Sequence, residues 1–178
     1  VGEYKDDERN GHGTFTWDWG EEYVGEFKDN SRNGQGFATK NNGEALRGLF
    51  KNHVLHEGRA IVNVDDEQKL QQWRNGEVIS ETWLTPEKKA EIIREQTNAA
   101  HFLLSSLGYG VGHVSTLPNA LMTSALSSYC KTSDAFNESC PDISTIDLRI
   151  DDLLAALQSS VVQKQSKTKI PITAPSNQ

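Results

Sequence analysis

The stretch VGEYKDDERNGHGTFTWDWGEE, residues 1–22, decides the fold because the chain repeats it. Residues 24–45 read VGEFKDNSRNGQGFATKNNGEA, and twelve of the twenty-two aligned positions are identical. Gly2, Gly25 and Gly48 mark a period of 23 residues, so a third and weaker copy follows the second. A fixed period of this length indicates a repeat array in which each copy packs against its neighbours.

Each copy has the pattern of a β-hairpin. Val-Gly-Glu-Tyr-Lys at residues 1–5 alternates charged and uncharged side chains, which predicts a strand. Arg-Asn-Gly-x-Gly follows at 9–13 and 32–36, and Asn-Gly is typical of a tight turn that needs positive φ. Residues 14–17, Thr-Phe-Thr-Trp, favour a return strand. We therefore expect one hairpin per copy, with the turn at Asn-Gly.

The aromatic side chains of the copies predict how the hairpins stack. A lone hairpin is marginally stable, so its apolar face must be covered by the next one. Tyr4, Phe27 and Phe50 occupy the same position in three copies. We expect these rings to form one ladder in register, with Tyr23 and Leu46 beside it.

The second copy resembles the MORN (membrane occupation and recognition nexus) repeat. The pattern consists of an aromatic residue, a spaced glycine, a second aromatic, a Gly-x-Gly turn and a closing glycine. Over residues 1–64 it is carried by Gly2, Tyr4, Gly11, Gly13, Tyr23, Gly25, Phe27, Gly34, Gly36, Gly48 and Phe50. The resemblance implies an antiparallel hairpin array. It does not specify the function, because such repeats occur in scaffolds, in lipid-associated proteins and beside unrelated enzymes.

The net charge bounds the class of partner. The chain has a formal charge of −7, and residues 1–85 hold ten Lys and Arg against sixteen Asp and Glu. An acidic array repels phosphate groups, which argues against nucleic acid and against an anionic membrane surface as partners.

The sequence predicts a β + α fold: an N-terminal MORN-type antiparallel hairpin array followed by a small helical unit. We place the hairpins at residues 1–84, the last of them closing the stack over Leu70–Ile79, the helical unit at 85–162 and a disordered tail at 163–178, where Lys, Gln, Ser, Thr and Pro dominate. Since the chain begins inside a repeat, we expect the natural protein to extend further towards the N-terminus.

The helical unit has clear start signals and periodic apolar residues. Thr85-Pro86-Glu87 predicts a helix start, with Thr85 as N-cap. A second helix is expected at 117–129, and a third carries apolar residues at helical spacing between Ile146 and Val161.

The two cysteines, Cys130 and Cys140, flank the connection between the second and third expected helices. A disulfide here would staple that connection and would indicate an extracytoplasmic location, periplasmic or secreted. The alternative is two reduced thiols in a cytosolic chain.

No set of residues predicts catalysis. The five histidines are not spaced to complete a metal site or a nucleophilic set, so we assign no catalytic, metal or cofactor residues and no cofactor. Trp17 and Trp19 occur only in the first copy, where the second has Lys40 and Asn42. They are the candidates for an exposed contact.

The interpretation that follows is a non-enzymatic module that binds or scaffolds another protein. The alternatives are an accessory region of an enzyme and a membrane-surface module. The first comes from the family, since MORN arrays accompany phosphatidylinositol phosphate kinases and a lysine methyltransferase. The second comes from the family name and conflicts with the charge. The partner and the oligomeric state do not follow from the sequence.

Overall fold

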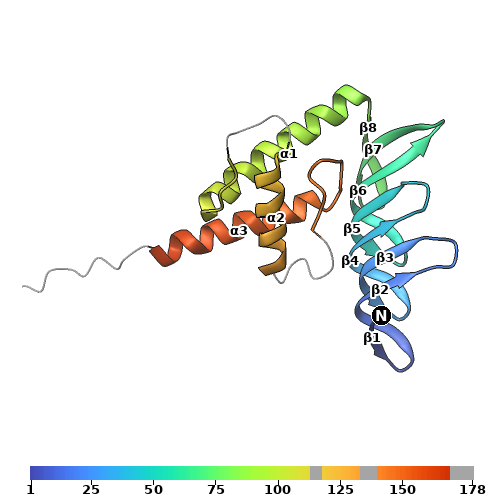
Figure 1. The fold of residues 1–178 in the computed structure, drawn as a ribbon. Coiled ribbons are helices and arrows are strands. Elements are labelled where there is room, and N and C mark those ends of the chain that lie inside the picture. The colour runs from blue at the N-terminus through green and yellow to red at the C-terminus, as the bar shows by residue number, and fades with distance from the viewer. Residues whose placement is uncertain (113–117, 133–139, 169–178) are drawn as a thin grey trace, which may run out of the picture. The chain divides into compact units, whose positions relative to one another are not determined.

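The computed structural model describes residues 1–112, 118–132 and 140–168. The chain forms two compact units, Val1–Ala90 and Glu91–Gln178, each of which is considered by itself. A sheet is followed by three helices (Figure 1), which confirms the predicted β + α fold class. The division falls within the first helix, after Ala90.

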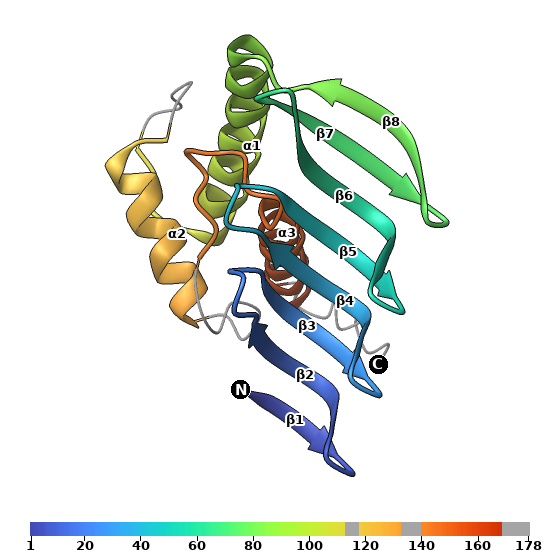
Figure 2. The same ribbon diagram turned by 90° about the vertical axis from the view of Figure 1, so that its right-hand side faces the viewer.

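The N-terminal unit is one antiparallel sheet whose eight strands lie side by side in chain order (Figure 2). Consecutive strands pair as a meander, and together they make four hairpins. The strands are β1 (Gly2–Lys5), β2 (Glu8–Thr16), β3 (Glu22–Lys28), β4 (Ser31–Thr39), β5 (Ala45–Lys51), β6 (Val54–Val64), β7 (Glu67–Arg74) and β8 (Glu77–Trp83).

In each of the first two copies the tight turn lies four residues before the predicted Asn-Gly position. The turns of the four hairpins fall at Asp6–Asp7, Asp29–Asn30, Asn52–His53 and Asn75–Gly76, and both residues of every turn have positive φ. The 23-residue period is thus kept through a fourth hairpin. The prediction that Asn-Gly forms the turn was wrong for the first two copies. Asp and Asn tolerate the left-handed conformation well enough to serve there.

The Asn-Gly pairs instead make β-bulges within β2 and β4. The register shifts between Gly25 and Phe27, where β4 carries extra residues opposite Glu26. Gly34 has φ +114°, and a Cβ there would collide with the folded Glu26 side chain. The Glu26 carboxylate accepts a hydrogen bond from Gln35 N at 2.9 Å. Positive φ is therefore used to form the bulge, which bends the strand and increases its twist.

A row of glycines crosses the sheet and makes room for an aromatic core. Gly13, Gly25, Gly36 and Gly48 are cross-strand neighbours on consecutive strands. A Cβ on Gly36 would overlap the ring of Tyr23, which is fully buried. The spaced glycines of the repeat therefore allow a ring to lie flat against the backbone.

The buried core of the sheet differs from the predicted ladder. Tyr23 is its centre, with edge-to-face contacts to Phe27 (5.0 Å between centroids) and to Phe50 (5.2 Å). Phe27 and Phe50 are 5% and 0% exposed, but Tyr4 is 62% exposed and lies outside this cluster. Including Tyr4 in the ladder was wrong, because Tyr23 contacts only the two rings that flank it, those of Phe27 and Phe50.

The helices begin close to their predicted positions. They are α1 (Pro86–Leu107), α2 (Ala120–Thr132) and α3 (Ile150–Thr168). Thr85 caps α1, accepting a hydrogen bond from Lys88 N to Oγ1 at 3.2 Å. Ile146 precedes α3 rather than opening it. Residues 163–168, predicted as part of a disordered tail, are helical; residues 169–178 lie outside the described part of the chain.

The helical unit has its own core, formed by the inward faces of the three helices and two flanking segments. Tyr129 Oη and Ser160 Oγ lie 3.0 Å apart and join α2 to α3. The buried residues of this core are Ala100, Leu103, Leu104, Val111, Met122, Ala125, Leu126, Tyr129, Cys130, Ile143, Ile150, Leu153, Leu157 and Val161.

Candidate functional site

The rings of the sheet's core lie on one face, called here the aromatic face and defined by Phe15, Tyr23, Phe27, Phe50 and Trp73. Phe15 is directly opposite Tyr23 across β2 and β3, which puts them on the same face. Burial raises the pKa of Tyr23 to about 12. The neutral hydroxyl donates to Glu26 O at 3.1 Å. This part of the aromatic face is structural.

Two arginines at the same repeat position, Arg9 and Arg32, stack on the aromatic face. The Arg9 guanidinium lies 4.1 Å from the Phe15 centroid, and that of Arg32 lies 5.5 Å from Phe50. Arg32 is also ion-paired with Glu21. Contacts between guanidinium and ring stabilise the face while keeping charge at its surface.

Arg9 links the first hairpin to the turn of the second, and Arg32 links the second hairpin to the turn of the third. Arg9 N donates to Asn30 Oδ1 at 2.9 Å, and Arg9 Nη2 donates to Asn30 O at 3.1 Å. Arg32 Nη2 donates to His53 O at 3.1 Å. Burial, followed by the charges of Arg32 and Arg9, lowers the pKa of His53. Both arginines were predicted to lie in hairpin turns, whereas in the structure they link one hairpin to the next.

A second set of polar contacts lies at the other ends of the strands, in the loops that connect one hairpin to the next. Asn63 donates to Asn42 O at 2.7 Å through Nδ2, and its backbone N donates to Glu44 Oε1 at 3.2 Å. The hydrogen bond from Lys40 lowers the pKa of Glu44, and the contacts with Asn63 and Asn42 act in the same direction. The polar residues of the loops are thus engaged in holding successive hairpins together.

Trp17 and Trp19, predicted as exposed contacts, differ in burial. Trp17 packs edge-to-face on Phe15 with centroids 4.7 Å apart and belongs to the margin of the core. Trp19 stacks on Trp17 at 5.8 Å and is 63% exposed. Its backbone carbonyl accepts a hydrogen bond from Asn41 at 3.2 Å. The loop therefore holds Trp19 in place while leaving most of its ring accessible.

The last hairpin leaves its outer strand uncovered. All seven residues of β8 are exposed, among them the apolar side chains of Val78, Ile79 and Trp83. Among the described residues, β8 has only β7 as a strand neighbour. Leu84 N donates to Gln68 O at 2.8 Å, so by alternation Thr82 also faces β7 while the amides of Glu81 and Trp83 point outwards. The hairpin thus presents a free strand edge.

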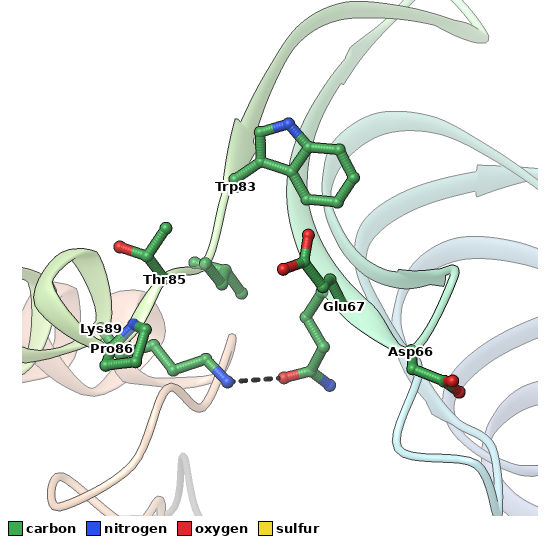
Figure 3. Close-up of a pocket in the computed structure, with 8 residues that line it drawn as sticks. Asp66, Glu67, Trp83, Thr85, Pro86 and Lys89 are labelled. Atoms are coloured by element: carbon green, nitrogen blue, oxygen red, sulfur yellow. Dashed lines mark hydrogen bonds between the residues drawn. The ribbon is translucent and has the colours of Figure 1, made fainter.

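A pocket of about 230 Å³ lies at the end of this hairpin, where β8 leads into α1 (Figure 3). Its wall combines an indole, two carboxylates and the first turn of the helix. Lys89 Nζ donates to Gln68 Oε1 at 3.0 Å across one side. The residues that Figure 3 labels are Asp66, Glu67, Trp83, Thr85, Pro86 and Lys89.

The pocket was not predicted from the sequence. Glu67 already begins β7, and only Asp65–Asp66 form the turn before it. The available signal was a tryptophan, Trp83, two residues before a helix N-cap, and an acidic run in the preceding turn. Pairing of β7 with β8 brings these two segments together.

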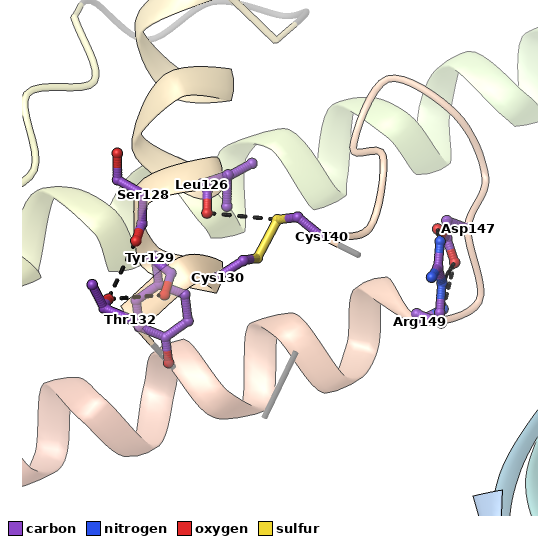
Figure 4. Close-up of a disulfide and its surroundings, with 8 residues drawn as sticks. All are labelled: Leu126, Ser128, Tyr129, Cys130, Thr132, Cys140, Asp147 and Arg149. Atoms are coloured by element: carbon purple, nitrogen blue, oxygen red, sulfur yellow. Dashed lines mark hydrogen bonds and ion pairs between the residues drawn. A yellow bond between two sulfur atoms is a disulfide. The ribbon is translucent and has the colours of Figure 1, made fainter. Parts of the chain in front are cut away.

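The cysteine pair lies in the helical unit, where Cys130 and Cys140 form a disulfide (Figure 4) with 5.6 Å between their Cα atoms. That separation is ordinary for a disulfide. Cys130, on α2, is buried in the helical core, and Cys140 Sγ lies 3.5 Å from Leu126 O. The bond joins α2 to the segment that leads towards α3. Residues 133–139, inside the closed loop, are outside the described part of the chain.

Within the described residues, no group of three or more His, Cys, Asp or Glu is placed to hold a metal ion. In the same residues, no helix combines the length and apolar content that crossing a membrane requires.

Comparison with known proteins identifies the repeat. A model of the MORN repeat family matches residues 1–22 and 23–45, the first two hairpins with the loop that follows each. No curated protein matches the chain. The matched segments coincide with the repeats read from the sequence, and the fold supplies the hairpins that the repeat implies. The chain therefore carries two MORN repeats at the start of its hairpin array.

Proposed function

We propose that the protein is a non-enzymatic module that binds another protein through the hairpin array. The observation that carries the proposal is the exposed outer strand β8, with outward amides at Glu81 and Trp83 and exposed apolar side chains at Val78 and Ile79. An uncovered strand edge can accept an extended segment of a partner as a further strand. Backbone hydrogen bonds then supply affinity, and alternate side chains supply specificity.

The rest of the array supports a scaffolding role. Arg9, Arg32 and Asn63 each bind a neighbouring hairpin, so the repeat's polar residues maintain the shape of the sheet. A rigid platform reduces the entropy lost on binding.

The charge of the array favours a protein over an anionic membrane as the partner. Residues 1–85 hold ten Lys and Arg against sixteen Asp and Glu, a balance of −6. Binding to phosphatidylserine or phosphoinositides needs clustered basic residues. We expect liposomes containing these lipids not to retain the protein at physiological salt. Salt-sensitive co-sedimentation with them would support the membrane alternative instead.

The experiment that tests the proposed function is selection of binders from a displayed library of extended peptides, followed by measurement of Kd for two variants. Glu81→Pro removes one outward amide of β8, at a position where an edge strand tolerates proline. Glu81→Gln is the matched control, because it removes the charge but keeps the amide. We expect peptides whose affinity survives Glu81→Gln and falls at least tenfold with Glu81→Pro. Failure to select any peptide, or equal binding to both variants, would contradict the proposal.

A further inference from the structure

The pocket beside Trp83 is sized for one side chain. Its volume of about 230 Å³ is below the range of roughly 300–1,000 Å³ that pockets for small-molecule ligands occupy. Its lining residues belong to the N-terminal unit, and among them Trp83 ends the outer strand β8 and is followed by Leu84 and the helix N-cap Thr85. A segment added along β8 would run past this pocket. The site therefore fits a side chain that such a segment carries.

The chemistry of the pocket favours a cation. Within the described residues, the side chains of Asp66 and Glu67 make no hydrogen bond or ion pair. In Figure 3 the Glu67 carboxylate lies next to the Trp83 ring, whereas Asp66 lies at the margin. Trp83 is 44% exposed, so part of its side chain is accessible to a ligand. Lys89, a cation that lines the pocket, donates a hydrogen bond to Gln68.

The same indole already binds a cation within the sheet. Lys69 Nζ lies 4.3 Å from the Trp83 centroid and 3.1 Å from Glu81 Oε2. In this contact the negative face of the indole and the neighbouring carboxylate both attract the same cation. Neither Lys69 nor Glu81 lines the pocket. There the carboxylate that accompanies the indole is that of Glu67.

A guanidinium suits this arrangement better than an ammonium. It is planar, stacks on an aromatic face and can donate two parallel hydrogen bonds to one carboxylate. The sheet uses arginine in this way elsewhere, where Arg32 contacts Trp17 and pairs with Glu21. The negative balance of the hairpin array would also speed the approach of a basic partner.

We propose that the pocket beside Trp83 binds an arginine side chain of the partner protein, with its guanidinium stacked on the indole and paired with Glu67. This deepens the proposed function, on which it rests, by naming the chemistry of the partner. The positive charge of Lys89, across the pocket, repels the guanidinium. Removing the charge of Glu67 should therefore weaken binding of the arginine, and removing the charge of Lys89 should strengthen it.

The test is a titration followed by NMR of the indole N–H signals, with Trp83→Phe used to assign the Trp83 signal. The probes are Ac-Gly-Gly-Arg-Gly-Gly-NH2 and the same peptide with citrulline, which has nearly the same shape as arginine but no charge. We expect the arginine peptide to shift the Trp83 signal saturably and the citrulline peptide not to do so. Because the peptides differ and the protein does not, this comparison is independent of folding.

Two variants then test the walls of the pocket. Glu67→Gln should weaken the arginine peptide about 3- to 5-fold, and Lys89→Met should tighten it about 2-fold, as expected for partly exposed charge pairs. Unchanged Trp17 and Trp19 signals verify the fold of each variant. Equal shifts with citrulline, or unchanged affinity in Glu67→Gln, would overturn the arginine site. If peptides selected on β8 still bound in that case, the proposed function would stand without it.

Discussion

The hairpin array and the helical unit reach stability in different ways. In the array every strand pairs only with its neighbours in sequence, and each hairpin is tied to the next by the same few residues, such as Arg9 and Arg32. In the helical unit, one core joins three helices that are distant in sequence, and a disulfide closes it. This difference indicates which of the two units can bind a partner strand at low cost to its own stability. A terminal hairpin of a nearest-neighbour array can present an open strand without disturbing the rest.

The largest expected effect is the loss of a central ring from the array. Phe27→Ala removes a ring packed against Tyr23, which should cost about 3–5 kcal/mol of unfolding free energy. Tyr4→Ala is the matched control, because Tyr4 holds the same repeat position but is exposed, and should cost less than about 0.5 kcal/mol. Urea denaturation measures both. Similar losses for the two variants would refute the described core.

Removal of the disulfide should act on the other unit. Replacing both cysteines, Cys130→Ser with Cys140→Ser, opens a short loop and should cost about 2–3 kcal/mol. Helical circular dichroism should report the loss, while the tryptophan fluorescence, which comes from the sheet alone, should keep its denaturation midpoint. A shift of both signals together would contradict the view of two units with separate cores. The same bond bears on the proposed extracytoplasmic location, because disulfides persist in oxidising compartments.

A third change tests why the repeat needs glycine. Gly36→Ala places a methyl group where the Tyr23 ring lies, and overpacking of this kind should cost about 1–3 kcal/mol. Gly110→Ala, in the helical unit, meets no atom within 4 Å and is the control. The free energies of unfolding of the two variants decide the point. A neutral Gly36→Ala would mean that the Tyr23 ring does not rest on the glycine row.

The smallest effect is a pH dependence at the turn of the third hairpin. The folded state lowers the pKa of His53, so the unfolded state binds its proton more readily, and stability should decline as the pH falls through about 6.5. Asn at this position accepts the same turn conformation without titrating. The drop in urea midpoint between pH 7.5 and 5.5 should therefore be smaller in His53→Asn than in the parent. Identical drops would exclude His53 as a source of the pH dependence.

The sequence predicted the array because its signals are local and repeated. The 23-residue spacing of Gly2, Gly25 and Gly48 located the hairpins, and Pro86 located the start of α1. The position of the first two turns did not follow from Asn-Gly, because positive φ serves a bulge as well as a turn. Only the register distinguishes the two.

The pocket was beyond prediction for a different reason. Glu67 and Trp83 lie on strands whose pairing had to be known before they could be placed together. Likewise, the exposure of Tyr4 depends on its hairpin's place in the stack rather than on its repeat position. Periodicity identifies equivalent residues, but it does not show which copies have neighbours on both sides.

The most direct test of the central claim, that β8 receives a strand of the partner, is amide hydrogen exchange of β8 with and without a peptide selected from the displayed library. The outward amides of Glu81 and Trp83 should exchange at least tenfold more slowly when the peptide is saturating. The inward amide of Thr82 is already paired with β7 and should change little. Unchanged exchange at Glu81 and Trp83, with slowing confined to residues such as Trp19 or those of the helical unit, would contradict the account.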